Sequence, residues 1–234
     1  MENLHPKALC AYCAQPGADE SDHVIARQFF PADERYRGNL PQVTCCGACN
    51  RKKQRVENKP AVLFQFGHDS EASRRVLAER APRTLEKNRR LHTSLRQGLE
   101  EVLVRYPSGI LVPTLAIRLS PRELSDAHTW VQLVTKGLYC FEFKTSFPLD
   151  HTIHLLRPMD DRFTVFTDLI HRDRSHQARA VAAGEFQYAF ARNQTDGISL
   201  WYYAFKSINT VALTLSPSCP KDMRWRITKI EWQP

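Results

Sequence analysis

Two pairs of cysteines near the N-terminus constrain this chain more than any other feature of its sequence. Cys10 and Cys13 enclose two residues, and so do Cys46 and Cys49. A two-residue gap lets both sulfurs of a pair reach one tetrahedral ion at about 2.3 Å, and two such pairs complete a closed structural site. The spacing therefore predicts a structural zinc ion (Zn²⁺). Cys45 is an alternative to Cys46, but only Cys46 leaves two residues before Cys49.

The other cysteines do not suggest a disulfide framework. The chain has seven cysteines, an odd number; five of them cluster in its first fifty residues, and Cys140 and Cys219 are isolated. The N-terminus also lacks the basic start and apolar stretch of a secretory signal, so we expect a reducing, cytoplasmic environment. The segment that contains the two cysteine pairs is short and buries little apolar surface. Zinc binding would therefore supply much of the folding free energy of this segment.

A second pattern lies between and just after the cysteine pairs. Asp22 and His23 are neighbours, Asn39 follows Gly38, and the second pair runs directly into Asn50, which precedes Lys53 by three residues. In the order and neighbours of these residues, residues 8–58 resemble the HNH endonuclease family, whose catalytic module has a ββα-metal fold. The resemblance covers roughly a quarter of the chain and stops near residue 58.

The resemblance implies a role for each of these residues. Asp22 and Asn50 would hold a catalytic Mg²⁺ or Mn²⁺ through hard oxygen ligands, and His23 would be the general base that deprotonates water. Asn39 would tie the two strands together and orient the histidine loop, and Lys53 would hold the scissile phosphate. The implied reaction is hydrolysis of DNA to a 5′-phosphate and a 3′-hydroxyl. On a strand, Asp22 and His23 point to opposite faces, so both can serve one phosphate only where the strand twists or ends.

Two departures from the family pattern concern the residues around these groups. Family members often have proline shortly after the Asp-His pair, whereas Ala26 and Arg27 follow Ile25 here. The last position of the family motif is often histidine, and this chain has Asn50 instead, a recurrent variant. Neither departure removes an essential group, but both leave the choice of catalytic metal open.

The charge of the chain favours a polyanionic partner. Its formal net charge is +8 at pH 7, and double-stranded DNA is the partner that we expect. Residues 69–105 predict a strongly basic amphipathic helix interrupted near Pro82, which either contacts the DNA backbone or is an ordinary solvated face. The run from Arg51 to Arg55 poses the same alternative, and its position beside the nuclease motif favours phosphate contact.

The rest of the chain predicts an α+β fold with an antiparallel sheet. We expect three segments: a zinc-stapled ββα-metal (HNH) module over residues 1–60, a helical connector over 61–106, and an α+β domain of unknown role over 107–234. Ser120 and Glu123 predict a helix start, with the helix ending at Lys136 before Gly137. No apolar run approaches the ~20 residues of a membrane span. Strands are expected at residues 110–119, 138–143, 152–156, 185–191, 199–205, 210–215 and 225–232.

Two alternatives to a stand-alone DNA endonuclease remain open. The chain could be a nuclease effector of a bacterial antiviral defence or toxin system, controlled by a protein partner or by homodimerisation through its C-terminal domain. It could also be a zinc-dependent nucleic-acid-binding protein without catalysis. The joint presence of Asp22, His23 and Asn50 disfavours the second alternative, because binding alone requires none of them.

Overall fold

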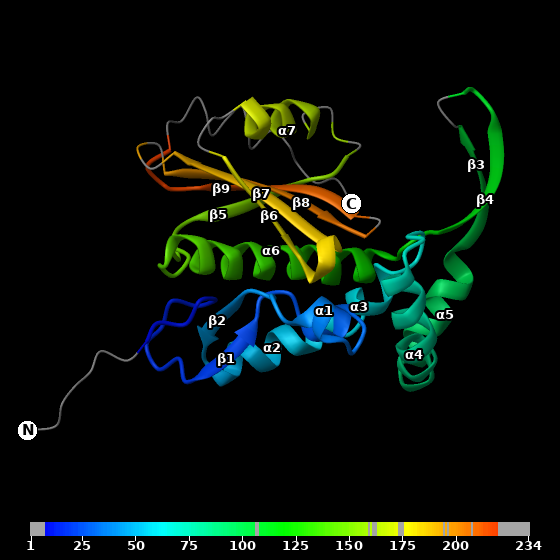
Figure 1. Ribbon diagram of the computed structural model, residues 1–234, viewed down its shortest axis with the longest axis horizontal. Coiled ribbons are helices and arrows are strands. Elements are labelled where there is room, and N and C mark those ends of the chain that lie inside the picture. Colours follow the sequence, from blue (N-terminus) through cyan, green and yellow to red (C-terminus); the bar gives the residue numbers. More distant parts are fainter. Residues whose placement is uncertain are drawn as a thin grey trace, which may run out of the picture.

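The computed structural model describes residues 8–105, 108–158, 160, 163–172, 176–193, 195, 197–206 and 208–219. It is a mixed α+β structure with antiparallel sheets, as the sequence predicts. The N-terminal segment contains the hairpin β1–β2 and the helix α2, and Figure 1 shows the long helix α6 lying between this segment and the large sheet. The elements of the first segment are β1 (Glu20–His23), η1 (Arg27–Phe29), α1 (Glu34–Arg37), β2 (Gln42–Cys45), α2 (Gly47–Glu57) and α3 (Pro60–Leu63).

The large sheet has five strands in the order β5-β9-β8-β7-β6, and all neighbours are antiparallel. One face packs on α6 and the other is covered by α7 (Figure 1). Alternation along β8 explains the two layers, because Trp201, Tyr203 and Phe205 join the core shared with α6, while Leu200 joins the core under α7. The elements are α6 (Pro121–Phe143), β5 (Thr152–Leu156), α7 (Phe163–Arg172), β6 (Gln177–Val181), η2 (Ala182–Gly184), β7 (Phe186–Asn193), β8 (Ile198–Phe205) and β9 (Ile208–Leu215).

Two helices and a hairpin connect the N-terminal segment to α6. These are α4 (Glu71–Lys87), α5 (Arg89–Gly98) and the hairpin of β3 (Leu99–Arg105) with β4 (Leu111–Ile117), which projects away from the body (Figure 1). The prediction that Pro82 interrupts a helix is wrong, since α4 passes through it. Buried Val76 and Ala81 anchor α4 before the proline, and the partly buried Leu85 packs on the core after it, so packing compensates for the lost hydrogen bond.

Four other sequence expectations about elements need correction or fall outside the described structure. Residues 99–105 are a strand rather than the end of a helix, because they pair with β4 along their whole length. The strand expected at residues 138–143 is wrong, and so is the helix end at Lys136, since α6 continues to Phe143. Residues 138–143 are mostly apolar, and their pattern has no periodicity that distinguishes a helix from a strand. The strand expected at residues 225–232 lies outside the described residues.

Other predicted elements are confirmed. Ser120 and Glu123 form the expected capping box at the start of α6. Strands occupy the expected positions at residues 110–119, 152–156, 185–191, 199–205 and 210–215, with bounds shifted by a few residues. Among the helices that the structure describes, none has the length and apolar character needed to cross a membrane.

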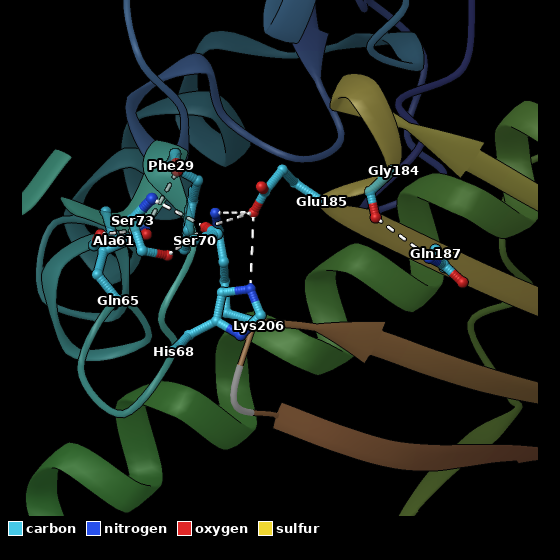
Figure 2. A network of polar contacts seen from close by, with 10 residues as sticks. All are labelled: Phe29, Ala61, Gln65, His68, Ser70, Ser73, Gly184, Glu185, Gln187 and Lys206. Atoms are coloured by element: carbon cyan, nitrogen blue, oxygen red, sulfur yellow. Dashed lines mark hydrogen bonds and ion pairs between the residues drawn. The ribbon is translucent and has the colours of Figure 1, made fainter. Parts of the chain in front are cut away.

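Polar contacts tie the connector to the large sheet. In Figure 2, Glu185 near the start of β7 lies at the centre of a network that joins three segments of the chain. Its carboxylate pairs with the buried Lys206, accepts a hydrogen bond from Ser70 at 3.2 Å, and lies 3.8 Å from His68 Nε2. Ser70 is also the N-cap of α4, so the network fixes where α4 begins relative to the sheet.

The contact between the N-terminal segment and α6 is tight at Gly137. A Cβ atom at this position would lie 2.7 Å from Val24 Cγ1 and 3.3 Å from the Tyr12 hydroxyl. Val24 is fully buried and its branched side chain has little rotameric freedom, so it cannot move aside easily. Because Gly137 has no side chain, Val24, the residue that follows His23, can pack directly against α6.

We expect Gly137→Ala to destabilise the protein, although alanine normally favours a helix over glycine by about 1 kcal/mol. The added methyl should lower the free energy of unfolding by about 1–3 kcal/mol through overpacking against Val24. Urea denaturation of the two proteins measures this difference. In a Val24→Ala background the same substitution should cost less, and a Gly137→Ala variant at least as stable as the parent would contradict the packing.

Candidate functional site

Four cysteines form a cluster of the size that one metal ion requires. The Sγ atoms of Cys10, Cys13, Cys46 and Cys49 all lie within 4.8 Å of one another, and Cys13 Sγ is 3.9 Å from Cys46 Sγ. Zinc–sulfur bonds of about 2.3 Å in a tetrahedron place the sulfurs roughly 3.8 Å apart. The donor set therefore fits a zinc ion, and the cluster predicted from the sequence is the only such group among the described residues.

Backbone amides prepare Cys10 for metal binding. The N–H groups of Tyr12 and Cys46 donate to its Sγ, both at 3.4 Å. Burial alone would raise the pKa of Cys10, but these backbone hydrogen bonds lower it to about 7. Cys45 differs, because it lies outside the cluster at the end of β2 and burial raises its pKa to about 12. The structure therefore resolves the alternative left by the sequence in favour of Cys46.

His23 is the last residue of β1 and opens onto a cleft. Its Nε2 accepts a hydrogen bond from Arg27 Nε at 3.2 Å and lies 3.1 Å from Gln42 Nε2, its cross-strand neighbour. A guanidinium can only donate, so Nε2 is the accepting nitrogen of a neutral ring. Burial lowers the pKa of His23, and the positive charge of Arg27 lowers it further. The imidazole is consequently a neutral acceptor near pH 7.

Asp22 is engaged in a buried ionic network. Its Oδ2 lies 2.9 Å from Lys53 Nζ and also accepts a hydrogen bond from the Tyr12 hydroxyl. Lys53 is completely buried, pairs with Glu57 at 2.6 Å, and donates to the backbone oxygen of His23 at 2.8 Å. Burial raises the pKa of Glu57 to about 7 despite the opposing effect of Lys53. Lys53 therefore links β1 to α2 in the protein interior. The expectation that Lys53 holds a phosphate does not match this buried position.

Asn50 and Asn39 do not line the cleft beside His23. The Asn50 amide donates to Glu20 Oε2 at 2.6 Å and its oxygen accepts from Gln54, and Asn50 does not line the cleft. The structure thus does not bring Asp22 and Asn50 together around one point of the cleft. Asn39 accepts a hydrogen bond from the Ala182 amide at 2.9 Å, so it fastens the N-terminal segment to η2 rather than bridging β1 and β2.

The cleft beside His23 has a volume of about 710 Å³. Asp22 and His23 both line it, as expected for neighbours at the point where a strand ends. The sequence analysis did not identify Arg27 or Gln42, the two contacts of the imidazole. The signal available for Arg27 was its position four residues after His23, at the start of the short helix η1. The lining residues are Asp22, His23, Ala26, Arg27, Gln28, Arg51, Gln54, Arg55, Glu57 and Asn58.

Comparison with protein-family models, with curated protein sequences and with solved structures gives no significant match for this chain.

The cysteine cluster predicts a stoichiometric zinc ion that depends on Cys46 and not on Cys45. Elemental analysis of the purified protein should find about one zinc per chain. Cys46→Ser should lose the ion and most of the folded N-terminal segment, because metal binding and folding of such segments are coupled. Cys45→Ala is the matched control and should retain zinc. A Cys46→Ser protein with full zinc content would contradict this assignment.

The buried position of Lys53 predicts a structural role that a surface lysine would not have. Lys53→Met should lower the free energy of unfolding by about 3–5 kcal/mol, because the carboxylates of Asp22 and Glu57 would lose their buried counter-ion. Lys52→Met, at the exposed neighbouring position, should leave stability nearly unchanged. Chemical denaturation of both variants measures the difference, and equal stabilities would show that Lys53 is not the ionic link described above.

Proposed function

We propose that the protein is a metal-dependent endonuclease of the HNH type that hydrolyses phosphodiester bonds in DNA, with His23 as the general base. The observation that carries this proposal is the pairing of a neutral, accepting His23 Nε2 with Arg27 at the wall of an open cleft. The sequence resemblance over residues 8–58 supports it, as does the order of the hairpin, the second cysteine pair and α2 along the chain.

The residues expected to hold a catalytic ion fit it only in part. Asp22 lines the cleft, and both of its described contacts use Oδ2, which leaves Oδ1 as the oxygen available to a cation. Mg²⁺ and Mn²⁺ commonly bind through one or two carboxylates and complete their shells with water and phosphate oxygens. Asn50 does not fit as the second ligand in this arrangement, because it lies outside the cleft lining and pairs with Glu20. The neighbouring Lys53 charge should also keep ion affinity low.

His23 would remove a proton from the attacking water. The water oxygen forms a bond to phosphorus while its proton moves to Nε2, and the bond between phosphorus and the 3′ oxygen breaks. The leaving oxygen takes a proton from solvent, which gives a 5′-phosphate and a 3′-hydroxyl. A divalent ion bound at Asp22 would stabilise the charge that develops on the phosphate. The lowered pKa keeps His23 in the basic form at neutral pH.

Arginines around the cleft would orient the substrate. Arg27, Arg51 and Arg55 line it, and guanidinium groups bind phosphate oxygens through paired hydrogen bonds. Arg27 can exchange its contact with His23 for one with a phosphate when substrate arrives, which would leave the Gln42 amide as the remaining described neighbour of Nε2. The net charge of +8 adds a long-range attraction for polyanions.

The proposal predicts that His23→Ala retains zinc and its circular dichroism spectrum but loses most DNA cleavage. General-base catalysis is worth roughly 10²–10⁴-fold, so the rate of plasmid nicking in Mg²⁺ should fall by that factor. His92→Ala, an exposed histidine of α5, is the control and should cleave at the parental rate. Asp22→Asn should also cleave slowly, with partial rescue by excess Mn²⁺.

Parental cleavage by His23→Ala would contradict the assignment of the base. A parent protein that binds DNA but shows no cleavage with Mg²⁺ or Mn²⁺ would overturn the nuclease proposal in favour of a zinc-dependent nucleic-acid-binding protein.

A further inference from the structure

Two further cavities continue from the His23 cleft. A second cavity of about 270 Å³ adjoins it, since Gln28 and Asn58 line both. A third cavity of about 360 Å³ continues from the second, and here Arg80 and Thr84 are the shared residues. The three cavities therefore form one groove that runs from His23 onto α4.

The α4 wall of this groove is a basic stripe. Its members are Arg80, Arg83, Thr84 and Lys87, which stand at the spacing i, i+3, i+4 and i+7 that places residues on one helix face. The stripe is about 10 Å long at 1.5 Å per residue. One nucleic-acid strand carries a phosphate about every 3.4 Å along the helix axis, so the stripe matches roughly three phosphates.

One acid, Glu79, lines the third cavity beside the stripe, and its described ion pair is with Arg75 at 3.9 Å rather than with a cation of the stripe. Within the described part of the chain, Arg80, Arg83 and Lys87 form no ion pair with a carboxylate. In the same helix, away from the groove, Arg74 pairs with Asp69 at 2.7 Å and Arg75 lies 3.6 Å from Asp33. Two arginines of one helix are thus neutralised by acids, and the three cations of the stripe are not.

Unneutralised cations also crowd together where the cavities meet. The pKa of Arg37 is lowered by burial and then by the charges of Arg80 and Arg27, which are close enough to repel it, and the Glu79 carboxylate opposes this only in part. Arg27 lines the cleft and Arg80 lines the next two cavities. Like charges so placed destabilise the free protein, and an anion in the groove would relieve the repulsion.

We propose that this groove binds the phosphate backbone of one polynucleotide strand and leads it from His23 along α4. The inference rests on the proposed function in taking the His23 cleft as the point of cleavage. It adds that the substrate is a polynucleotide extending about three phosphates beyond the cleaved bond. A small phosphodiester would reach the cleft without touching the stripe.

The test compares two triple variants built in the His23→Ala background, which prevents cleavage without a chelator. The first replaces the stripe (Arg80→Gln, Arg83→Gln, Lys87→Gln). The second replaces three exposed basic residues of α5 that line none of the three cavities (Arg89→Gln, Arg90→Gln, Arg96→Gln). Fluorescence anisotropy measures the affinity for a 16-base-pair duplex between 50 and 200 mM salt, and zinc content with circular dichroism verifies folding.

The stripe variant should bind the duplex at least 10-fold more weakly at 50 mM salt. The slope of log K against log salt should fall in magnitude by about 2–3, at about 0.9 per lost phosphate contact. The α5 variant should keep the parental slope. A stripe variant with the parental affinity and slope would overturn the proposal, and so would an α5 variant that loses as much as the stripe variant.

A second measurement separates failure of the groove from failure of the proposed function. With His23 restored, the stripe variant should hydrolyse bis(p-nitrophenyl) phosphate at the parental rate while its cleavage of plasmid DNA falls at least 10-fold. Equal losses on both substrates would contradict a role confined to the groove. If the parent hydrolyses neither substrate, the nuclease proposal fails, and the binding experiment still decides whether the groove holds a nucleic-acid backbone.

Discussion

The four-cysteine cluster is the constraint on which the N-terminal half depends. It joins the turn that carries Cys10 and Cys13 to the start of α2, where Cys46 is the N-cap. The Ala11 amide bonds to the Thr44 oxygen at 3.0 Å, so the same turn is also attached to β2. With its ion bound, the cluster would fix the crossing of α2 over the hairpin. That crossing places Lys53 beneath Asp22 and the end of β1 at the cleft.

The second support of the site is α6. Trp130 of this helix packs on Phe29 with ring centroids 4.9 Å apart, and Phe64 and Phe205 complete an aromatic cluster between the N-terminal segment and the large sheet. One core cluster has members from Cys10 to Ala212, so the N-terminal segment, α6 and the large sheet share an apolar interior. The N-terminal segment, which carries His23, is therefore packed against the long helix α6. A rigid support of this kind keeps a catalytic side chain in place.

The sequence could predict the parts of the site whose geometry is local. The cysteine spacing alone indicated the cluster, and the adjacency of Asp22 and His23 was enough to expect both at one cleft. It could not predict which basic residue of α2 is buried, because Arg51, Lys52 and Lys53 are equivalent in a charge pattern. Glu57 is a partner of Lys53 in the same helix, but Asp22 and His23 come from β1, about thirty residues earlier, and only tertiary packing brings them to Lys53. Asn39 and Ala182 meet over a still longer separation.

The same difference between local and long-range determinants applies to the fold. Strands rich in apolar and aromatic residues, such as β8, and a helix with a local capping signal, such as α6 at Ser120, were predictable. The end of α6 was not predictable. A glycine such as Gly137 is typical of a helix end, but here it lies inside α6 and allows close packing against Val24. Residues 99–105 form a strand because β4 lies opposite, which no local pattern reveals.

The most direct test of the central claim is a crystal structure of His23→Ala with a short DNA duplex and Mn²⁺, with anomalous scattering used to locate the ion. The account predicts one Mn²⁺ at Asp22, a phosphate oxygen in its coordination shell, and that phosphate in the cleft beside position 23. A duplex bound elsewhere, or Asp22 still paired with Lys53 and no ion in the cleft, would contradict it.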